Sequence, residues 1–380
     1  MPSCFMISMN KFKLPPISTL SGSTIINFFR VLAQGHIDPG YYFKIVLTIF
    51  VILIATPFHW WESFVFRRKI KKTKFTTPPV FILGHWRSGT TLLHNTLCID
   101  PSAGYVTTYQ SVFPNNLASK WLFKTFMKIN MPEKRPTDNI RLDIDAPQED
   151  EFAFSNMQPN AYYNFFYFPD RYRTFYDRAV HHKNLSGEEI KRWFKSYDVL
   201  LKKALLNSNG RRLIIKNPVN TARIKHMLKM YPDAKFVYIY RNPVTVILST
   251  RRFFKELFPT LILRKTENSS IDTMIYDIYP RLLDDYLEQK ALIPKENLLE
   301  IRYEDFEQNP SLIIKRIYSE LLQEDFTEVE EYYKAYFESI NGYVKNKYEV
   351  EKATIDEIKN RTARFMALYG YDIPEEIIIK

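Results

Sequence analysis

Short apolar runs alternate along the chain with longer segments that place apolar residues at helical spacing. The short runs lack the alternation of a half-exposed strand, so they predict parallel strands that are covered on both faces. Four such runs are Val80–Leu83, Leu213–Ile215, Phe236–Tyr240 and Asn297–Ile301. Helices are expected over residues 90–99 and 222–230, from about residue 244, and over residues 311–322. The pattern therefore predicts an α/β fold, a parallel sheet flanked by helices on both faces.

The chain before this region has a different pattern. Its most apolar stretch runs from Tyr41 to Trp61, with Lys44 as its only charged residue, and it predicts an N-terminal apolar helix. Aromatic residues at both ends, and six basic residues between Arg67 and Lys74, are typical of a segment that lies in or on a membrane. Its uninterrupted part is short for a bilayer span, and a helix buried against the main domain is the alternative.

The Thr-Thr-Pro-Pro sequence at residues 76–79 predicts a hinge, because the residue before a proline avoids helix. We expect an N-terminal membrane-associating segment over residues 1–75 and a main domain over residues 76–380. Within the main domain, residues 101–210 are rich in aromatic side chains and lack the alternating rhythm. We interpret them as an insertion that shapes a substrate site.

Charge and cysteine content narrow the class of protein. The 380-residue chain has a formal net charge of +11, which fits a phosphate-rich ligand, an anionic membrane surface or nucleic acid. Its two cysteines, Cys4 and Cys98, cannot form a disulfide framework or a zinc cluster. They favour a reducing compartment, and the basic flank favours the cytoplasmic face of a membrane.

A glycine loop follows the first predicted strand and opens the next helix, with the sequence Gly84-His-Trp-Arg-Ser-Gly-Thr-Thr91. Its two glycines have the spacing of a P-loop, in which backbone N–H groups and a helix N-terminus surround a phosphate. Thr90 stands where triphosphate-binding loops carry a lysine, and Arg87 supplies a cation inside the loop instead. This difference argues against triphosphate chemistry and suits a donor in which one 5′-phosphate is joined to a sulfate.

Residues 79–94, with their Arg-Ser-Gly-Thr-Thr loop, resemble the 5′-phosphosulfate loop of sulfotransferases that use 3′-phosphoadenosine 5′-phosphosulfate (PAPS). The resemblance is to the group that includes tyrosylprotein and many microbial sulfotransferases. Tyr240-Arg-Asn-Pro243 with Ser249, Tyr303-Glu-Asp305 and the segments at residues 346–348 and 369–371 are similar to the same group. The resemblance covers about residues 78–372. It implies donor-binding roles for Arg87, Ser88, Gly89, Thr90 and Thr91 at the 5′ end, Arg241 and Ser249 at the 3′-phosphate, and Tyr303 near the adenine.

Sulfuryl transfer requires cations at the leaving oxygen and a base near the acceptor hydroxyl. Arg87 is the first candidate for the leaving-group side, and the resemblance places a catalytic lysine at Lys216. The base is expected among the carboxylates of residues 149–151, with Glu151 and Glu149 ahead of His85 and His94. Relatives often carry a histidine where this chain has Asn220, which cannot act as a base. The chemistry requires no metal, and the sequence shows no ligand cluster of the usual spacing.

Three other classes of protein fit part of this pattern. A P-loop kinase would carry the missing loop lysine, and a nucleic-acid-binding protein would show a recognised motif beyond its charge. A non-catalytic membrane-surface protein would not need to retain Arg87, Lys216, Arg241 and Ser249. The leading prediction is transfer of a sulfuryl group from PAPS to a hydroxyl or amine acceptor on a lipid or a glycan. The oligomeric state is not encoded in any motif.

Overall fold

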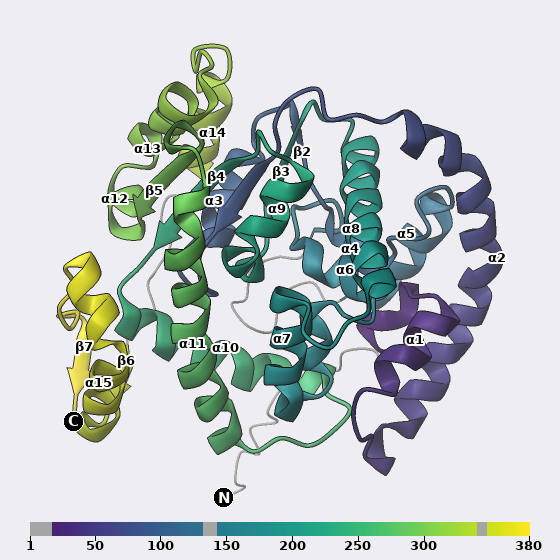
Figure 1. The fold of residues 1–380 in the computed structure, drawn as a ribbon, viewed down its shortest axis with the longest axis horizontal. Helices are drawn as coiled ribbons and strands as arrows, with labels where there is room; N and C mark the ends of the chain where they lie inside the picture. The colour runs from purple at the N-terminus through teal and green to yellow at the C-terminus, as the bar shows by residue number, and fades with distance from the viewer. Residues whose placement is uncertain (1–16, 132–142, 340–347) are drawn as a thin grey trace, which may run out of the picture.

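A parallel sheet forms the centre of the computed structural model, which describes residues 17–131, 143–339 and 348–380 (Figure 1). Within these residues its strand order is β2-β3-β1-β4-β5, with every neighbouring pair parallel. The strands are β1 (Val80–Leu83), β2 (Ala103–Gly104), β3 (Arg212–Lys216), β4 (Lys235–Tyr240) and β5 (Leu298–Arg302). The predicted α/β fold is confirmed, and the four expected apolar runs form β1, β3, β4 and β5.

Side chains of the strands pack into a different apolar cluster on each face of the sheet. Phe81 and Leu83 join one cluster, whereas Val80 and Ile82 join the other. The first face is covered by α8 (Gly187–Ser208), α9 (Ile224–Met230), α10 (Pro243–Leu261) and α11 (Asn268–Gln289). The second is covered by α3 (Thr90–Leu97), α12 (Tyr303–Gln308), α13 (Pro310–Arg316), the π-helical turn Ile317–Leu322 and α14 (Glu330–Ser339). This covering on both sides explains why β1, β3 and β4 carry no polar alternation, whereas the edge strand β5 exposes Glu300 between two buried residues.

The region expected as an insertion contributes mostly helices between β2 and β3. They are α4 (Thr108–Val112), α5 (Lys120–Asn130), α6 (Asp150–Met157), α7 (Tyr172–His181) and α8, with 3₁₀ turns at Tyr162–Phe166 and Pro169–Arg171. Its aromatic side chains are mainly buried, and many of them pack against α10 or α8. The capping box of Ser186 and Glu189 fixes the start of α8.

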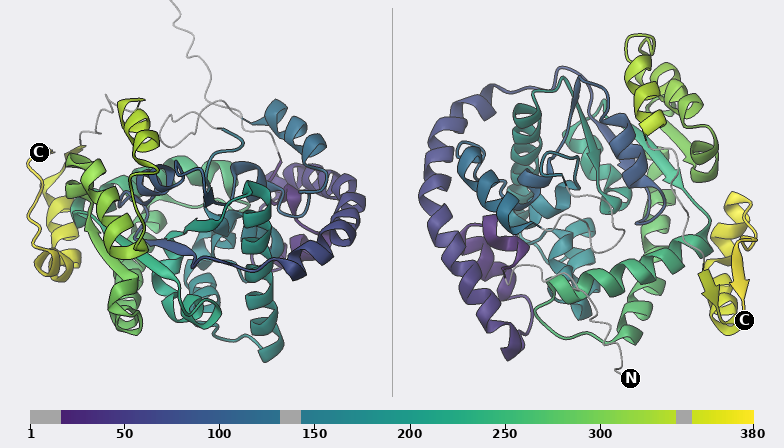
Figure 2. Two further views of the ribbon diagram at one scale, coloured as in Figure 1. Left: turned by 90° about the horizontal axis from the view of Figure 1, so that it is seen from above. Right: turned by 180° about the vertical axis from the view of Figure 1, so that it is seen from behind.

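The N-terminal segment folds as a 3₁₀ turn (Thr19–Gly22), α1 (Ile25–Leu32), a second 3₁₀ turn (Pro39–Tyr41) and α2 (Tyr42–Lys72). Together the second turn and α2 are long and apolar enough to cross a membrane, judged by length and composition. The helix α2 runs along one edge of the molecule (Figure 1, Figure 2). Its inner face is buried and comprises Thr48, Val51, Ile52, Ala55, His59 and Glu62.

The opposite face of α2 exposes nine large apolar side chains, which we call the outer stripe. Its members are Tyr42, Phe43, Val46, Phe50, Leu53, Ile54, Trp60, Trp61 and Phe64. At 100° per residue these positions fall on one side of the helix, and Arg68, Lys71 and Lys72 continue the same side at its C-terminal end. The helix is therefore apolar on two opposite faces, only one of which packs against protein.

The C-terminal part adds a two-stranded parallel sheet of β6 (Tyr348–Val350) and β7 (Ile377–Ile379) around α15 (Lys352–Tyr369). Tyr369 stacks on Tyr240 at the end of β4, with ring centroids 4.4 Å apart. Asn346 and Lys347, which belong to the family-like sequence, lie outside the described residues, as does Cys4.

Candidate active site

The loop between β1 and α3 has the conformation that its glycines predict. Gly84, Arg87 and Gly89 all have positive φ angles, of 144°, 68° and 101°. A Cβ atom on Gly89 would lie 2.2 Å from the ring of Tyr303, so only glycine fits there without displacing that ring. Thr221 fixes the start of the loop, since its hydroxyl accepts a hydrogen bond from the Gly84 N–H at 2.8 Å.

Within the loop, Ser88 donates a hydrogen bond to the carbonyl oxygen of His85 at 2.8 Å. Thr90 and Thr91 form the first turn of α3, with Thr90 buried and Thr91 half-buried. The backbone therefore turns around a small space at the N-terminal end of α3, as in an anion-binding loop.

Four of the predicted donor-binding residues meet beside this loop, although they come from distant parts of the chain. Arg87 donates from Nε to the hydroxyl of Ser249 on α10 at 2.9 Å. Arg241, which follows β4, donates to the carbonyl oxygen of Arg87 at 3.4 Å. Its guanidinium lies 4.0 Å from the ring centroid of Tyr303, the first residue of α12. Two arginines, a serine hydroxyl and an aromatic face thus lie together next to the glycine loop.

Lys216 and Glu149 form an ion pair on the other side of the loop. Lys216 ends β3 and also contacts the hydroxyl of Thr91, with its Nζ at 3.2 Å. Glu149 accepts a second hydrogen bond from the hydroxyl of Tyr163, which in turn accepts one from Nε1 of Trp86 at 2.9 Å. Glu149 keeps 14% of its side-chain surface exposed, whereas Lys216 keeps 3%. The pair therefore connects the loop with a carboxylate that solvent can reach.

Glu151 has a different environment, because its side chain and that of Arg223 are both fully buried. The two make a bidentate pair, with Nη1–Oε2 and Nη2–Oε1 distances of 2.7 and 3.0 Å. Asn217 donates to the same carboxylate at 2.7 Å, and the Tyr162 N–H donates to it as well. Glu149 and Glu151 point to different partners because they lie two residues apart, at the start of α6.

Asp150, between these two glutamates, is buried and accepts a hydrogen bond from the Tyr197 hydroxyl at 2.7 Å. Burial, and then the neighbouring Glu151 charge, raise the pKa of Asp150 to about 7. Asn220, where relatives often carry a histidine, donates to the same Tyr197 hydroxyl at 2.9 Å. Asn220 therefore belongs to the buried network of Asp150 and Tyr197, whereas Glu149 is partly exposed.

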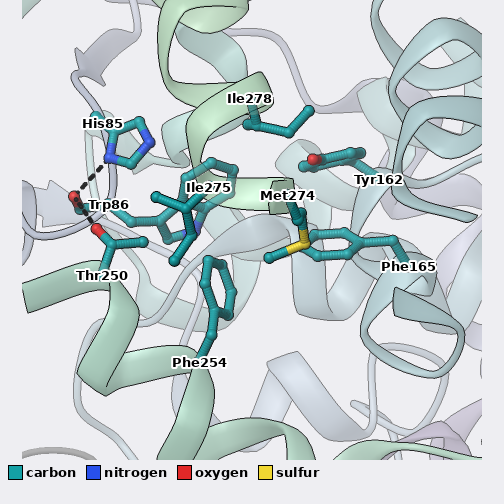
Figure 3. A pocket seen from close by; sticks show the side chains of 9 residues that line it. All are labelled: His85, Trp86, Tyr162, Phe165, Thr250, Phe254, Met274, Ile275 and Ile278. Atoms are coloured by element: carbon teal, nitrogen blue, oxygen red, sulfur yellow. Dashed lines mark hydrogen bonds between the residues drawn. The ribbon is translucent and has the colours of Figure 1, made fainter. Parts of the chain in front are cut away.

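A small pocket adjoins the loop at His85 and Trp86 (Figure 3). Its other walls come from the Tyr162–Phe166 turn, α10 and α11, and they are Tyr162, Phe165, Thr250, Phe254, Met274, Ile275 and Ile278. Burial lowers the pKa of His85 to about 4, so its ring is neutral at pH 7. Its Nδ1 therefore donates to the Trp86 carbonyl oxygen, 2.8 Å away. Trp86 belongs both to this pocket and to the hydrogen-bond chain that ends at Glu149.

Three residues of this arrangement were not predicted from the sequence: Arg223, Tyr163 and Trp86. Arg223 is the cation that neutralises Glu151, and with Lys225 and Lys229 close by, nothing in the sequence distinguished it. Tyr163 lies within an aromatic run whose members look alike in sequence. His94, a minor candidate for the base, is buried in α3.

The glycine loop, the parallel sheet and the cationic cluster define a group-transfer enzyme of the sulfotransferase class. The chain belongs to the sulfotransferase family, whose model matches residues 78–328. The family resemblance noted in the sequence is thereby confirmed.

Curated relatives are similar over most of their length. The omega-hydroxy-beta-dihydromenaquinone-9 sulfotransferase Stf3 of Mycobacterium tuberculosis is 29% identical over 331 residues, which cover 86% of this chain and 84% of that protein. The same enzyme of Mycobacterium bovis matches equally well.

Solved structures show the same fold at low sequence identity. Sulfotransferase STF9 from Mycobacterium avium superposes with a TM-score of 0.67 at 15% identity, covering 92% of this chain and 90% of that one. Sulfotransferase STF1 from M. tuberculosis gives a TM-score of 0.62 at 15% identity, covering 89% and 91%.

Proposed function

We propose that this sulfotransferase takes its sulfuryl group from PAPS and transfers it to the hydroxyl of a lipid acceptor. The observation that carries the choice of donor is the meeting of Arg87, Ser249 and Arg241. Two cations and a hydroxyl beside a glycine loop suit a ligand with phosphate groups at both its 5′ and 3′ positions. Tyr303, stacked on Arg241, offers an aromatic face for a nucleobase.

Different residues bind the donor and stabilise the leaving group. The backbone of Ser88, Gly89, Thr90 and Thr91 surrounds the 5′-phosphosulfate, while Arg241 and Ser249 hold the 3′-phosphate. The acceptor oxygen attacks sulfur in line, so an O–S bond forms as the bond from sulfur to the phosphate oxygen breaks. The phosphate oxygen keeps the electron pair, and Arg87 and Lys216 stabilise its growing charge.

Glu149 is the proposed general base, which accepts the proton of the acceptor hydroxyl. Its carboxylate is partly exposed and lies beside Lys216. An acceptor hydroxyl bound at Glu149 would therefore lie close to both the base and the leaving group. Glu151 is fully buried against Arg223 and cannot touch an acceptor, so we assign it a positioning role at the start of α6.

The donor can be tested with 3′-phosphoadenosine 5′-phosphate, the product nucleotide. We expect this nucleotide at 100 times its Kd to stabilise the folded protein by about 2.7 kcal/mol, seen as a rise in Tm. ATP with magnesium should give a smaller rise, because the loop lacks the lysine of triphosphate-binding enzymes. A larger rise with ATP and magnesium would replace this proposal with a kinase-like one.

A lipid acceptor is supported by the exposed apolar outer stripe of α2. The relative Stf3 is named for a menaquinone-derived acceptor. Transfer of labelled sulfate from PAPS into total cell lipid and into total polysaccharide separates a lipid acceptor from a glycan. Label in polysaccharide alone would refute the lipid assignment.

We also propose that the enzyme works at the cytoplasmic face of a membrane. The basic residues between Arg67 and Lys74 would be attracted to an anionic leaflet by about 1 kcal/mol for each charge near the surface. Fractionation of cells into soluble, peripheral and integral membrane proteins tests this location. A protein confined to the soluble fraction would contradict it.

A further inference from the structure

We propose that α2 lies in the plane of the membrane surface, with its outer stripe in the interfacial layer and its inner face still docked on the catalytic domain. The inference rests on the proposed membrane association and specifies its geometry. The helix is long enough to span a bilayer, so the choice between spanning and lying flat depends on what its inner face contacts.

Polar groups on the inner face bind the rest of the protein along most of α2. Glu62 and Lys203 of α8 form an ion pair with side-chain exposures of 2% and 7%. His59 hydrogen-bonds Asn116 at 2.9 Å, and the Ser18 N–H donates to Thr48 at 2.9 Å. A spanning helix would place Glu62 and His59 in hydrocarbon without these partners, and it would remove the counter-charge of Lys203.

The outer stripe, in contrast, is apolar and exposed. Phe64 and Trp60 are 81% and 72% exposed, and the stripe extends over residues 42–64 without a charged member. That length corresponds to about 33 Å of helix at 1.5 Å per residue. Such a continuous apolar surface is unusual on a soluble protein and marks an interaction site.

Charge complementarity favours a lipid surface, and not a second copy of the chain, as the partner of the outer stripe. Arg68, Lys71 and Lys72 are exposed and extend the same side of α2, so two copies that met through the stripe in parallel would bring like charges together. An anionic bilayer offers hydrocarbon to the aromatic side chains and phosphate groups to the basic ones. Helices with an apolar face and basic neighbours bind in the interfacial plane in this way.

Vesicle co-sedimentation tests the surface, with the full chain and vesicles of phosphatidylcholine containing 30% phosphatidylglycerol. We expect Trp60→Asp with Trp61→Asp to lower the partition coefficient at least tenfold. Leu292→Asp is the matched control, because Leu292 is 57% exposed on a different surface, and it should bind as the wild type does. Neutralising Arg68, Lys71 and Lys72 to Gln should weaken binding about fivefold for each charge.

Labelling from one side of the membrane tests the orientation. Gly40→Cys and Lys74→Cys place a thiol at either end of α2, in a background with Cys4→Ser and Cys98→Ala. At Gly40 a Cβ atom meets no other atom within 4 Å. In sealed inside-out membrane vesicles, a membrane-impermeant maleimide should label both positions equally, and carbonate at pH 11 should release the protein. Labelling of only one end, until detergent is added, would overturn the in-plane arrangement in favour of a span.

Two other outcomes would also overturn the inference. One is a lipid-free dimer in analytical ultracentrifugation that Trp61→Asp dissociates, combined with no binding to vesicles. The other is a wild-type protein that binds 3′-phosphoadenosine 5′-phosphate but ignores anionic vesicles. In that second case the proposal of PAPS as donor stands. A wild-type protein that binds anionic vesicles but not 3′-phosphoadenosine 5′-phosphate would refute that donor and leave the membrane geometry intact.

Discussion

Glu149 and Glu151 lie two residues apart, yet replacing each with glutamine should affect a different property: stability at Glu151 and turnover at Glu149. Glu151→Gln leaves Arg223 as a buried cation without its counter-charge, and removing one partner of such a pair costs about 3–5 kcal/mol. The structure favours the upper part of this range, because both side chains are fully buried and the carboxylate accepts hydrogen bonds from Arg223, Asn217 and Tyr162. Glutamine keeps one acceptor oxygen but loses the bidentate pair and the charge.

The measurement is the free energy of unfolding from urea titration, together with turnover at saturating donor. We expect Glu151→Gln to lose about 3–5 kcal/mol of stability. Adding Arg223→Met should restore much of it, because removing both charges leaves neither one buried alone. Glu149→Gln should lower kcat about 10²- to 10⁴-fold while 3′-phosphoadenosine 5′-phosphate binds normally.

A Glu151→Gln variant that unfolds at the wild-type urea concentration and loses turnover instead would refute a structural role for Glu151. Wild-type kcat in Glu149→Gln would exclude Glu149 as the base, because a general base cannot be replaced by an amide without loss of rate. His85 would then be the next residue to examine.

Further predictions concern the donor site and the buried acids. Arg241→Ala should weaken 3′-phosphoadenosine 5′-phosphate binding at least tenfold, measured by calorimetry, since a charge-assisted hydrogen bond contributes about 1.5–3 kcal/mol. Lys216→Ala should lower kcat about 10²- to 10³-fold, with a smaller change in donor Kd; an unchanged kcat would exclude a catalytic role. Gly89→Ala should reduce nucleotide affinity because its Cβ would meet the Tyr303 ring, whereas Gly187→Ala, where the added Cβ has open space, should not. Asp150 has a folded-state pKa of about 7 against an ordinary 3.8, so its contribution to stability should fall as pH rises from about 4 to 7. Asp150→Asn should remove that dependence, and a wild-type stability advantage over this variant that grew with pH would contradict the assignment.

Most of the fold was predictable because its signals are local. β1, β3 and β4 are buried on both faces, so apolar runs marked them directly. Glycines with an internal arginine marked the loop. Family resemblance assigned Arg87 and Ser249 to the two ends of one donor, but their hydrogen bond was not predicted, since nothing local relates residues 162 positions apart.

The parts that sequence did not predict depend on tertiary pairing. Glu149 and Glu151 were equivalent candidates until the structure placed Arg223, 72 residues further along, against only one of them. The apolar stretch of α2 predicted membrane association, with a helix buried against the main domain as the alternative, and the structure shows one packed and one exposed face. The contacts of Thr48, His59 and Glu62 with the rest of the protein identify the packed face.

Because α2 is packed on one side and exposed on the other, it limits how such an enzyme can change during evolution. Ala55 is part of an apolar cluster with Tyr109, Phe113 and Phe123 of the region before β3, so the helix is a wall of the core. A membrane anchor joined by a linker can be lost or exchanged without harm to the enzyme it carries. Here the outer stripe and a wall of the core belong to one helix, so a deletion that removed the stripe would also open the core. A soluble descendant would have to arise by replacing exposed residues of the outer stripe one at a time.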